Sequence, residues 1–182
     1  MADETRRNAK LIVTSMGLAQ AREARRALAR AVPGARITGT GLKGVFSLQA
    51  EGDPLEIARI VYRECGAQIG HVTAVLAEVD SKLETIRQAA VDVGAAQIGK
   101  EETFSFRIHK RGAHYLEQDT SVLEREIGGA IWQALRAKHG VEPRVRLKDP
   151  DVAVVAEVLG PVTAVGISRK AWHEQPPAGQ PA

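Results

Sequence analysis

The chain has 182 residues, of which 44% are hydrophobic and 26% charged, and its formal net charge is +3. This composition is typical of a folded globular protein and excludes a disordered chain. No stretch approaches the run of about 18 apolar residues that a membrane span needs, so we expect a cytoplasmic protein with no membrane partner. The single cysteine, Cys65, excludes an internal disulfide and a zinc site built from paired cysteines.

The first 80 residues predict the order strand, helix, strand, strand, helix, strand, which is the βαββαβ order of a ferredoxin-like domain. The predicted strands are residues 11–13, 36–40, 45–50 and 71–80, and the predicted helices are residues 18–31 and 54–65. The first helix is amphipathic and ends at the Pro33-Gly34 breaker. Asp53 and Pro54 mark the start of the second helix, and Glu56 lies where it can complete a capping box.

Three glycines, Gly39, Gly41 and Gly44, have the G-x-G-x-x-G spacing of a dinucleotide-binding loop. That loop places a pyrophosphate at the start of a helix. Here the glycines are followed by Val45-Phe46-Ser47-Leu48, which is a strand pattern. We therefore predict a hairpin turn and no nucleotide site.

The second half begins with a helix signal. Ser81 and Glu84 form a capping-box pattern, Ser121 and Glu124 form another, and apolar residues at helical spacing follow each pair. A helix is therefore expected after each serine.

Strand patterns lie between and after these two helices. Phe104, Phe106 and Ile108 alternate with polar residues, which predicts a strand with one buried face. Residues 152–159 are nearly continuously apolar, as in a strand covered on both sides, and residues 162–169 form one more strand.

The chain contains none of the common catalytic patterns. No phosphate-binding G-x-x-x-x-G-K-S/T loop, H-E-x-x-H pair, G-x-S-x-G elbow or C-x-x-C pair occurs. His109 and His114 lie near each other, but neither has an obvious nucleophile or a second set of ligands. We therefore expect no catalytic residue, no cofactor and no metal, and we interpret the histidines as solvated or facing RNA.

Two basic stretches suggest an anionic partner. Residues 107–114 carry three cations, two histidines and no carboxylate, and Gly112 would allow the backbone to approach a ligand closely. Residues 136–148 carry five cations against the single acid Glu142. Clustering of this kind favours nucleic acid, although a solvated strand end would show the same pattern.

The helix after Ser121 has a polar side that carries a tryptophan. Arg125, Gly129, Trp132 and Arg136 fall opposite the apolar stripe at 3.6 residues per turn. Trp132 could stack on a base, or it could pack against the first domain, and the sequence leaves both open.

From Thr103 onward the chain resembles a THUMP domain, over about its last half. The resemblance is carried by residues in a fixed order and spacing, namely Arg107, Lys110-Arg111-Gly112, His114, Gly128-Gly129 and Lys148-Asp149-Pro150-Asp151. The preceding half is similar to the ferredoxin-like domain that accompanies THUMP in RNA-modifying proteins. The resemblance implies that the two domains grip transfer RNA, with THUMP holding the acceptor stem and its 3′ end.

The resemblance also implies a role. THUMP enzymes that thiolate or methylate tRNA carry a further ATP-using or adenosylmethionine-binding domain, which we do not find before Ala182. The chain is similar to stand-alone THUMP adaptors that assist tRNA cytidine acetyltransferase in making N4-acetylcytidine, and its opening L-I-V-T-S-M-G agrees with them. Two alternatives stay open: a tRNA-binding subunit of a split thiolation or methylation enzyme, and a protein interaction module that uses the face of Trp132.

The sequence thus predicts an α+β protein in three parts: a ferredoxin-like domain over residues 1–80, an α/β THUMP domain over 81–172, and a flexible tail over 173–182. The predicted RNA-binding residues are Arg107, Lys110, Arg111, Gly112, His114, Arg125, Gly128, Gly129 and Lys148. Asp149 is expected to be structural, because a carboxylate before proline suits a turn and would repel phosphate.

Overall fold

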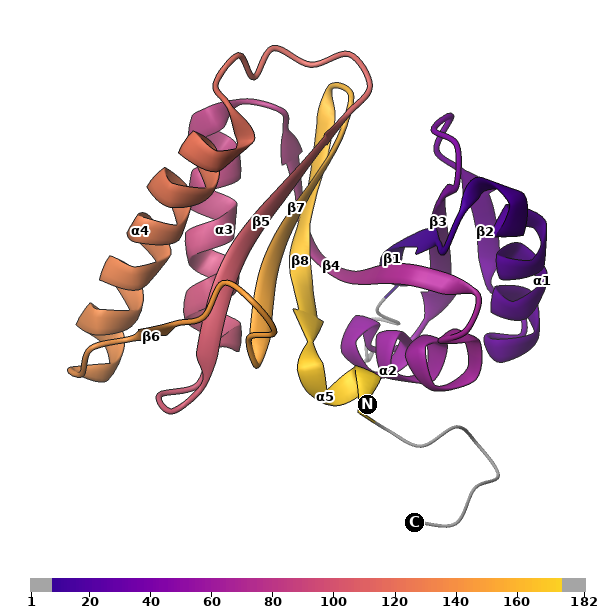
Figure 1. The fold of residues 1–182 in the computed structure, drawn as a ribbon, viewed down its shortest axis with the longest axis horizontal. Helices are drawn as coiled ribbons and strands as arrows, with labels where there is room; N and C mark the ends of the chain where they lie inside the picture. Colours follow the sequence, from indigo (N-terminus) through magenta and orange to yellow (C-terminus); the bar gives the residue numbers. More distant parts are fainter. Residues whose placement is uncertain (1–7, 175–182) are drawn as a thin grey trace, which may run out of the picture. The chain divides into compact units, whose positions relative to one another are not determined.

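The structure of the protein is a computed structural model that describes residues 8–174. It divides into two compact units, one formed by Met1–Val75 with Trp172–Ala182 and the other by Leu76–Ala171. The fold is mixed α/β, and its eight strands follow the hydrogen-bonded order β2-β3-β1-β4-β8-β7-β5-β6 (Figure 1). None of the helices in the described part of the chain is long and apolar enough to cross a membrane.

The first unit follows the predicted order of elements. These are β1 (Asn8–Ser15), the 3-10 turn η1 (Leu18–Gln20), α1 (Ala21–Ala31), β2 (Arg36–Gly39), β3 (Val45–Glu51), α2 (Pro54–Cys65) and the first part of β4 (Ile69–Asp80). Strand β1 pairs antiparallel with both β3 and β4, and β2 pairs antiparallel with β3. Helices α1 and α2 pack against each other, and α2 also packs against β1.

The start of α2 confirms one half of its predicted capping box. Asp53 Oδ1 accepts a hydrogen bond from the backbone N–H of Leu55 at 2.7 Å, and Pro54 occupies the first turn. Glu56 does not complete the box, because its carboxylate pairs with Arg59 at 2.8 Å one turn further along the helix. The N-terminus of α2 is therefore capped by Asp53 alone.

The glycine motif forms the predicted hairpin turn between β2 and β3. Gly41 and Gly44 have φ angles of 82° and 73°, which only glycine adopts at little cost. Thr40 fastens the turn, because its Oγ1 donates to the carbonyl of Val45 at 3.0 Å. The glycines thus serve the backbone of a hairpin, and no helix follows them.

The second unit contains the end of β4 and the elements α3 (Leu83–Gln97), β5 (Thr103–Arg111), α4 (Thr120–His139), β6 (Arg144–Val145), β7 (Val152–Leu159) and β8 (Val162–Arg169). Strand β5 runs parallel to β6 and β7, and β7 runs antiparallel to β8. Helices α3 and α4 lie side by side on one face of these strands (Figure 1). The bounds of β7 and β8 are those that the apolar pattern predicts.

Helices α3 and α4 approach each other closely at one glycine. A Cβ atom on Gly94 would lie 2.8 Å from Cγ2 of Ile131, so a larger residue would push the helices apart. Ile131 and Ile98, the two side chains next to Gly94, are almost fully buried. The α3/α4 pair therefore forms a rigid support beneath β5 and β7.

Both serine capping boxes predicted for the second unit are wrong. Neither α3 nor α4 has a side-chain cap hydrogen bond, and they begin after Lys82 and Asp119. Ser81 is buried and shares a 2.8 Å hydrogen bond with Thr163 instead. Glu124 is also occupied elsewhere, because its carboxylate faces β5. The sequence pattern alone is typical of a capping box. In the structure, however, the side chains of Ser81 and Glu124 form hydrogen bonds with residues of other elements.

The end of the described chain packs on the first unit. Trp172 and His173 lie in the short helix α5 (Lys170–His173), and their rings are 6.2 Å and 4.0 Å from the ring of Tyr62. Trp172 is only 5% exposed. The predicted flexible tail therefore does not begin at 173, and its residues 175–182 lie outside the described residues.

Candidate nucleic-acid interface

A groove in the second unit lies between β5, α4 and the segment around β6. We call it the α4 groove; it has a volume of about 410 Å³. Its walls are mostly apolar or small, with two cations and the carboxylate of Glu124 among them, and include Phe106, Arg107, Arg125, Gly128, Gly129, Trp132 and Leu147. Its size falls in the range of about 300–1,000 Å³ that is usual for small-ligand pockets.

Two glycines of α4 open the floor of the α4 groove. A Cβ atom on Gly129 would meet no atom within 4 Å, and one on Gly128 would meet only Cβ of Phe106, at 3.8 Å. The fold therefore does not require glycine at Gly129 for space, and glycine in a helix interior costs about 1 kcal/mol relative to alanine. The missing side chains leave room that a ligand can use.

Trp132 closes one end of the α4 groove. Its indole Nε1 donates to the carbonyl of Pro143 at 3.1 Å, and the guanidinium of Arg136 lies 5.4 Å from the centre of its ring. The hydrogen bond fixes the indole in place, and the cation over the ring occupies part of one face. Within its own unit, Trp132 therefore packs against Pro143 and Arg136.

Arg107 is one of the predicted RNA contacts, and it holds three elements together. Its Nη1 donates to Glu124 Oε2 at 3.1 Å, and its Nη2 donates to the carbonyl of Leu147. Glu124 Oε1 also accepts from the backbone N–H of Ile108 at 3.3 Å. β6 pairs with β5 only at Thr103 and Phe104. Further along β5, the carboxylate of Glu124 takes the place of a neighbouring strand as the acceptor for the backbone N–H of Ile108. Arg107 thus shapes the wall of the groove.

The next predicted cations are also engaged by the protein. Lys110 Nζ donates to the carbonyl of Gln118 at 2.7 Å, which ties the end of β5 to the loop before α4. Arg111 forms an ion pair with Glu157, whose side chain is fully buried. A buried carboxylate without a cation would be costly, so Arg111 is needed by the fold.

Gly112 and His114 shape the loop between β5 and α4. Gly112 has a φ of 74°, and a Cβ there would lie 3.1 Å from the backbone nitrogen of Gly160. The close approach predicted for Gly112 is therefore to the β7–β8 turn. His114 Nδ1 accepts from the backbone N–H of Leu116 at 3.3 Å, which orders the loop.

Arg125 and Lys148 differ from the other predicted cations. Both are exposed, and across residues 8–174 neither side chain has a hydrogen bond or an ion pair. Arg125 lines the α4 groove, and Lys148 follows the groove residue Leu147 in the chain. These two cations are available to an anion without breaking a contact of the fold.

The Lys148-Asp149-Pro150-Asp151 segment is fixed by its two carboxylates. Asp149 has a φ of 55° and pairs with Lys170 at 2.8 Å, consistent with the structural role expected of it. Asp151 Oδ2 accepts from both Oγ1 and the backbone N–H of Thr103, each at 2.7 Å. These hydrogen bonds from Thr103 lower the pKa of Asp151. The Thr103–Asp151 link could not be predicted from sequence, because the two residues are 48 positions apart in the chain.

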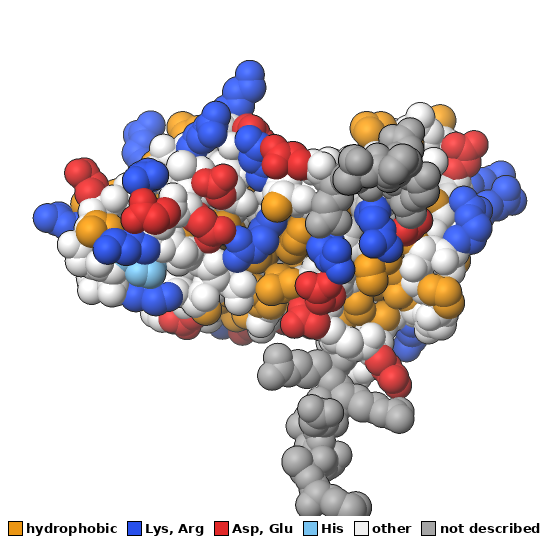
Figure 2. All heavy atoms as spheres, turned by 90° about the horizontal axis from the view of Figure 1, so that it is seen from below, with side chains coloured by type: hydrophobic (Ala, Val, Ile, Leu, Met, Phe, Trp, Pro, Cys, Tyr) orange, Lys and Arg blue, Asp and Glu red, His pale blue; other side chains and the backbone are white. Residues whose placement is uncertain are grey.

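Two other basic residues near the end of α4 have partners within the second unit. Arg144 pairs with Glu101 at 2.8 Å, and Lys138 Nζ donates to the carbonyl of Ala95. Figure 2 shows Lys and Arg side chains intermingled with Asp and Glu in its left-hand part. This face therefore carries charges of both signs.

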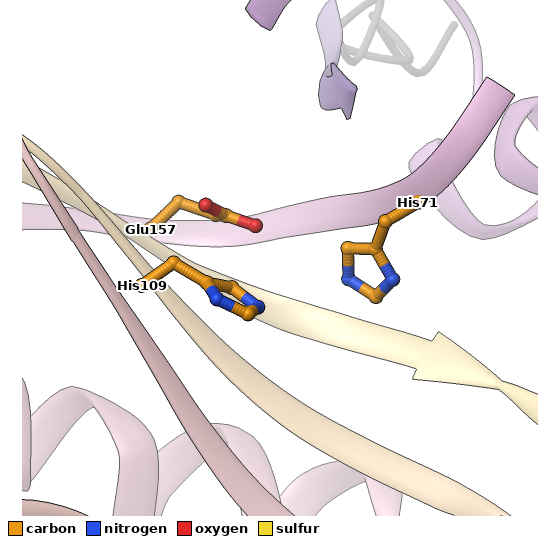
Figure 3. Close-up of side chains that lie close together, drawn as sticks. All are labelled: His71, His109 and Glu157. Atoms are coloured by element: carbon orange, nitrogen blue, oxygen red, sulfur yellow. The ribbon is translucent and has the colours of Figure 1, made fainter. Parts of the chain in front are cut away.

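His109 and Glu157 face each other from neighbouring strands of the second unit. They are register partners on β5 and β7, and Figure 3 shows both side chains on the same side of these strands. The third side chain in Figure 3, His71, belongs to the first unit. Within the second unit, the Glu157 carboxylate is paired with Arg111.

Comparison with known families identifies the second unit. Residues 80–168 match the model of the THUMP domain, a domain that binds RNA. The comparison with curated proteins found no match.

Solved structures share the fold of the chain. PH1313 from Pyrococcus horikoshii Ot3 has a TM-score of 0.61 at 19% identity, over 88% of this chain and 54% of that one. TrmN from Thermus thermophilus has a TM-score of 0.58 at 22% identity, over 88% and 46%. A 4-thiouridine synthetase, solved with RNA and bound ATP, has a TM-score of 0.58 at 17% identity, over 90% and 42%. The chain spans about half the length of these structures.

Proposed function

Because residues 80–168 are a THUMP domain, we propose that this chain binds transfer RNA through the α4 groove and the cations beside it. The observation that carries the proposal is the groove itself, an apolar hollow of about 410 Å³ floored by Gly128 and Gly129 within an RNA-binding domain. Flat unpaired bases suit such a hollow, because RNA recognition relies on stacking and on close approach to unpaired nucleotides.

The charges beside the groove suit the RNA backbone. Arg125 and Lys148 are exposed and form no ion pair within the described residues, so each can contact phosphate. Arg107 lies half-exposed on the groove wall and offers a third positive charge while remaining tied to Glu124. In this arrangement phosphate contacts position the RNA, and the groove accepts its single-stranded 3′ end.

We further propose that the chain acts as an adaptor without a catalytic site of its own, presenting tRNA to a separate modification enzyme in the cytoplasm. The opening segment L-I-V-T-S-M-G and the THUMP domain support an adaptor of tRNA cytidine acetyltransferase, which makes N4-acetylcytidine. The antiparallel order β2-β3-β1-β4 of the first unit supports its interpretation as a ferredoxin-like domain that grips tRNA together with THUMP.

A second function is favoured by the structural comparisons. The similar structures include TrmN and a 4-thiouridine synthetase, so the chain could instead be the tRNA-binding part of a methylation or thiolation enzyme. Reconstitution separates the two proposals. The adaptor proposal expects the chain to raise the rate of cytidine acetylation by a purified acetyltransferase. Stimulation of methylation or thiolation alone would favour the second function.

The test of RNA binding compares three ligands at two salt concentrations: whole tRNA, tRNA lacking its 3′ single strand, and a plain RNA duplex. We expect the tightest binding to whole tRNA. The affinity should also fall with salt concentration as steeply as several phosphate contacts require. The variants Arg125→Ala and Lys148→Ala should each weaken binding to all three ligands, and Lys100→Ala, which removes one exposed charge of the second unit outside the groove lining, is the matched control. Equal and weak binding to all three ligands would instead favour a protein interaction module.

A further inference from the structure

Tyr115 presents an aromatic ring that the fold does not use. It lies in the loop between β5 and α4 and is 96% exposed, more than any other large hydrophobic side chain in residues 8–174. Most tyrosines bury the body of the ring and expose only the hydroxyl. A ring that is exposed on both faces contributes little to folding, so its position calls for a different explanation.

The loop around Tyr115 is held in place on both sides. After it, Leu116 is buried and its backbone N–H bonds to His114 at 3.3 Å. Before it, Gly112 packs against the backbone of Gly160, whose N–H donates to the carbonyl of Arg111 at 2.9 Å. These contacts fix the backbone on either side of Tyr115, so the ring is held outward by an ordered loop.

Two cations lie close to Tyr115 in the chain. Lys110 donates to the carbonyl of Gln118 and has no carboxylate partner in the described residues, whereas Arg111 is paired with Glu157, and Glu117 follows the ring by two residues. An exposed aromatic ring next to cations is the combination that nucleic-acid-binding proteins use, since the ring stacks on a base and the cations contact phosphate. A protein partner would more often need an apolar surface around the ring, whereas Gly112 and Ala113 are small and exposed.

We propose that Tyr115 stacks on an unpaired base of the bound RNA, as a second contact outside the α4 groove. The inference rests on the proposed RNA-binding function and adds a base contact to it. Stacking on an aromatic ring accepts any base, because every base has a π face. Tyr115 would therefore strengthen binding to single-stranded segments without reading their sequence.

The experiment measures tRNA affinity of the full chain with Tyr115→Ala, Tyr115→Phe and the control Val122→Ala. Val122 is 46% exposed on the first turn of α4, so it tests the loss of an exposed apolar side chain near the same loop. We expect Tyr115→Ala to weaken tRNA binding about 5- to 100-fold, and Tyr115→Phe and Val122→Ala to stay within about 2-fold of wild type. The salt dependence should not change, because no charge is removed.

A second readout tests stacking directly. Single-stranded RNA carrying 2-aminopurine should lose fluorescence on binding the wild type and Tyr115→Phe, and keep it with Tyr115→Ala. Unchanged tRNA affinity of Tyr115→Ala, or an equal loss on duplex RNA, would overturn the stacking proposal and leave the proposed function standing. A wild-type chain that does not bind tRNA would overturn both.

Discussion

Arg107 and Glu124 form a 3.1 Å ion pair that fastens the edge of β5 to α4. The same carboxylate accepts the backbone N–H of Ile108, so one side chain satisfies a strand edge and orients an arginine on the wall of the α4 groove. This pair links the stability of the second unit to the shape of its ligand groove.

Replacement of Glu124 should separate these two roles. Glu124→Ala leaves the N–H of Ile108 without a partner and should lower the free energy of unfolding by about 1–2 kcal/mol. Glu124→Gln keeps an acceptor oxygen for Ile108, and because the lost ion pair is partly exposed it should cost less than about 1 kcal/mol. Urea unfolding followed by circular dichroism measures both. Equal losses in the two variants would show that the hydrogen bond to Ile108 contributes nothing.

Gly129 offers a test in which stability and binding move in opposite directions. Because a Cβ there meets no atom within 4 Å, Gly129→Ala should raise the free energy of unfolding by up to about 1 kcal/mol. Gly129→Leu should remain folded but fill the α4 groove, and it should weaken binding of tRNA with an intact 3′ end about 10-fold or more. Duplex RNA, which does not enter the groove, is the control. A Leu variant that binds whole tRNA like wild type would exclude the groove from the interface.

Much of the fold could be predicted because its signals are local. The continuous apolar runs gave β7 and β8 their observed bounds, and Asp53-Pro54 marked the start of α2. Strand β6 was not predicted, because it is two residues long and is defined by pairing with Thr103 and Phe104, about 40 residues away. The two predicted capping boxes also failed because of tertiary contacts: Ser81 bonds to Thr163, and Glu124 bonds to β5.

The candidate site was predictable in position but not in detail. Basic residues, glycines and Trp132 were all identified, and the α4 groove brings Arg107, Arg125, Gly128 and Gly129 together with Trp132. The sequence could not show which cations the fold already uses. Arg111 is paired with a glutamate 46 residues later, and that glutamate looks like any other charge in an apolar strand.

The Thr103–Asp151 link predicts a specific pH dependence. Hydrogen bonds from Thr103 lower the folded-state pKa of Asp151, so the carboxylate stabilises the fold above its unfolded-state pKa. That contribution should be lost as pH falls through the folded-state pKa, below about 4. Asp151→Asn should therefore be less stable than wild type at pH 7, and the difference should shrink toward pH 3 in urea unfolding.

Thr103→Val is the matched control, because it removes the hydroxyl donor but leaves the carboxylate. It should reduce the same pH-dependent difference. A stability difference between wild type and Asp151→Asn that stays constant from pH 7 to pH 3 would contradict this account.

The cations of the second unit should divide into two groups when mutated. Arg111→Ala leaves the fully buried Glu157 without its cation and should lower the free energy of unfolding by about 3–5 kcal/mol. Arg125→Ala and Lys148→Ala remove exposed charges with no partner in the described residues, so each should change stability by less than about 0.5 kcal/mol. Their effect should appear in tRNA binding instead, with the salt slope reduced by about 1 for each lost phosphate contact.

A second substitution distinguishes a structural from a direct role of Arg111. The double variant Arg111→Ala, Glu157→Gln also removes the buried negative charge and should recover a large part of the lost stability. If tRNA affinity recovers with it, Arg111 acts on RNA only by maintaining the fold. If stability recovers while binding stays weak, the arginine also contacts RNA, and the interface extends from the α4 groove to the end of β5 beside Tyr115.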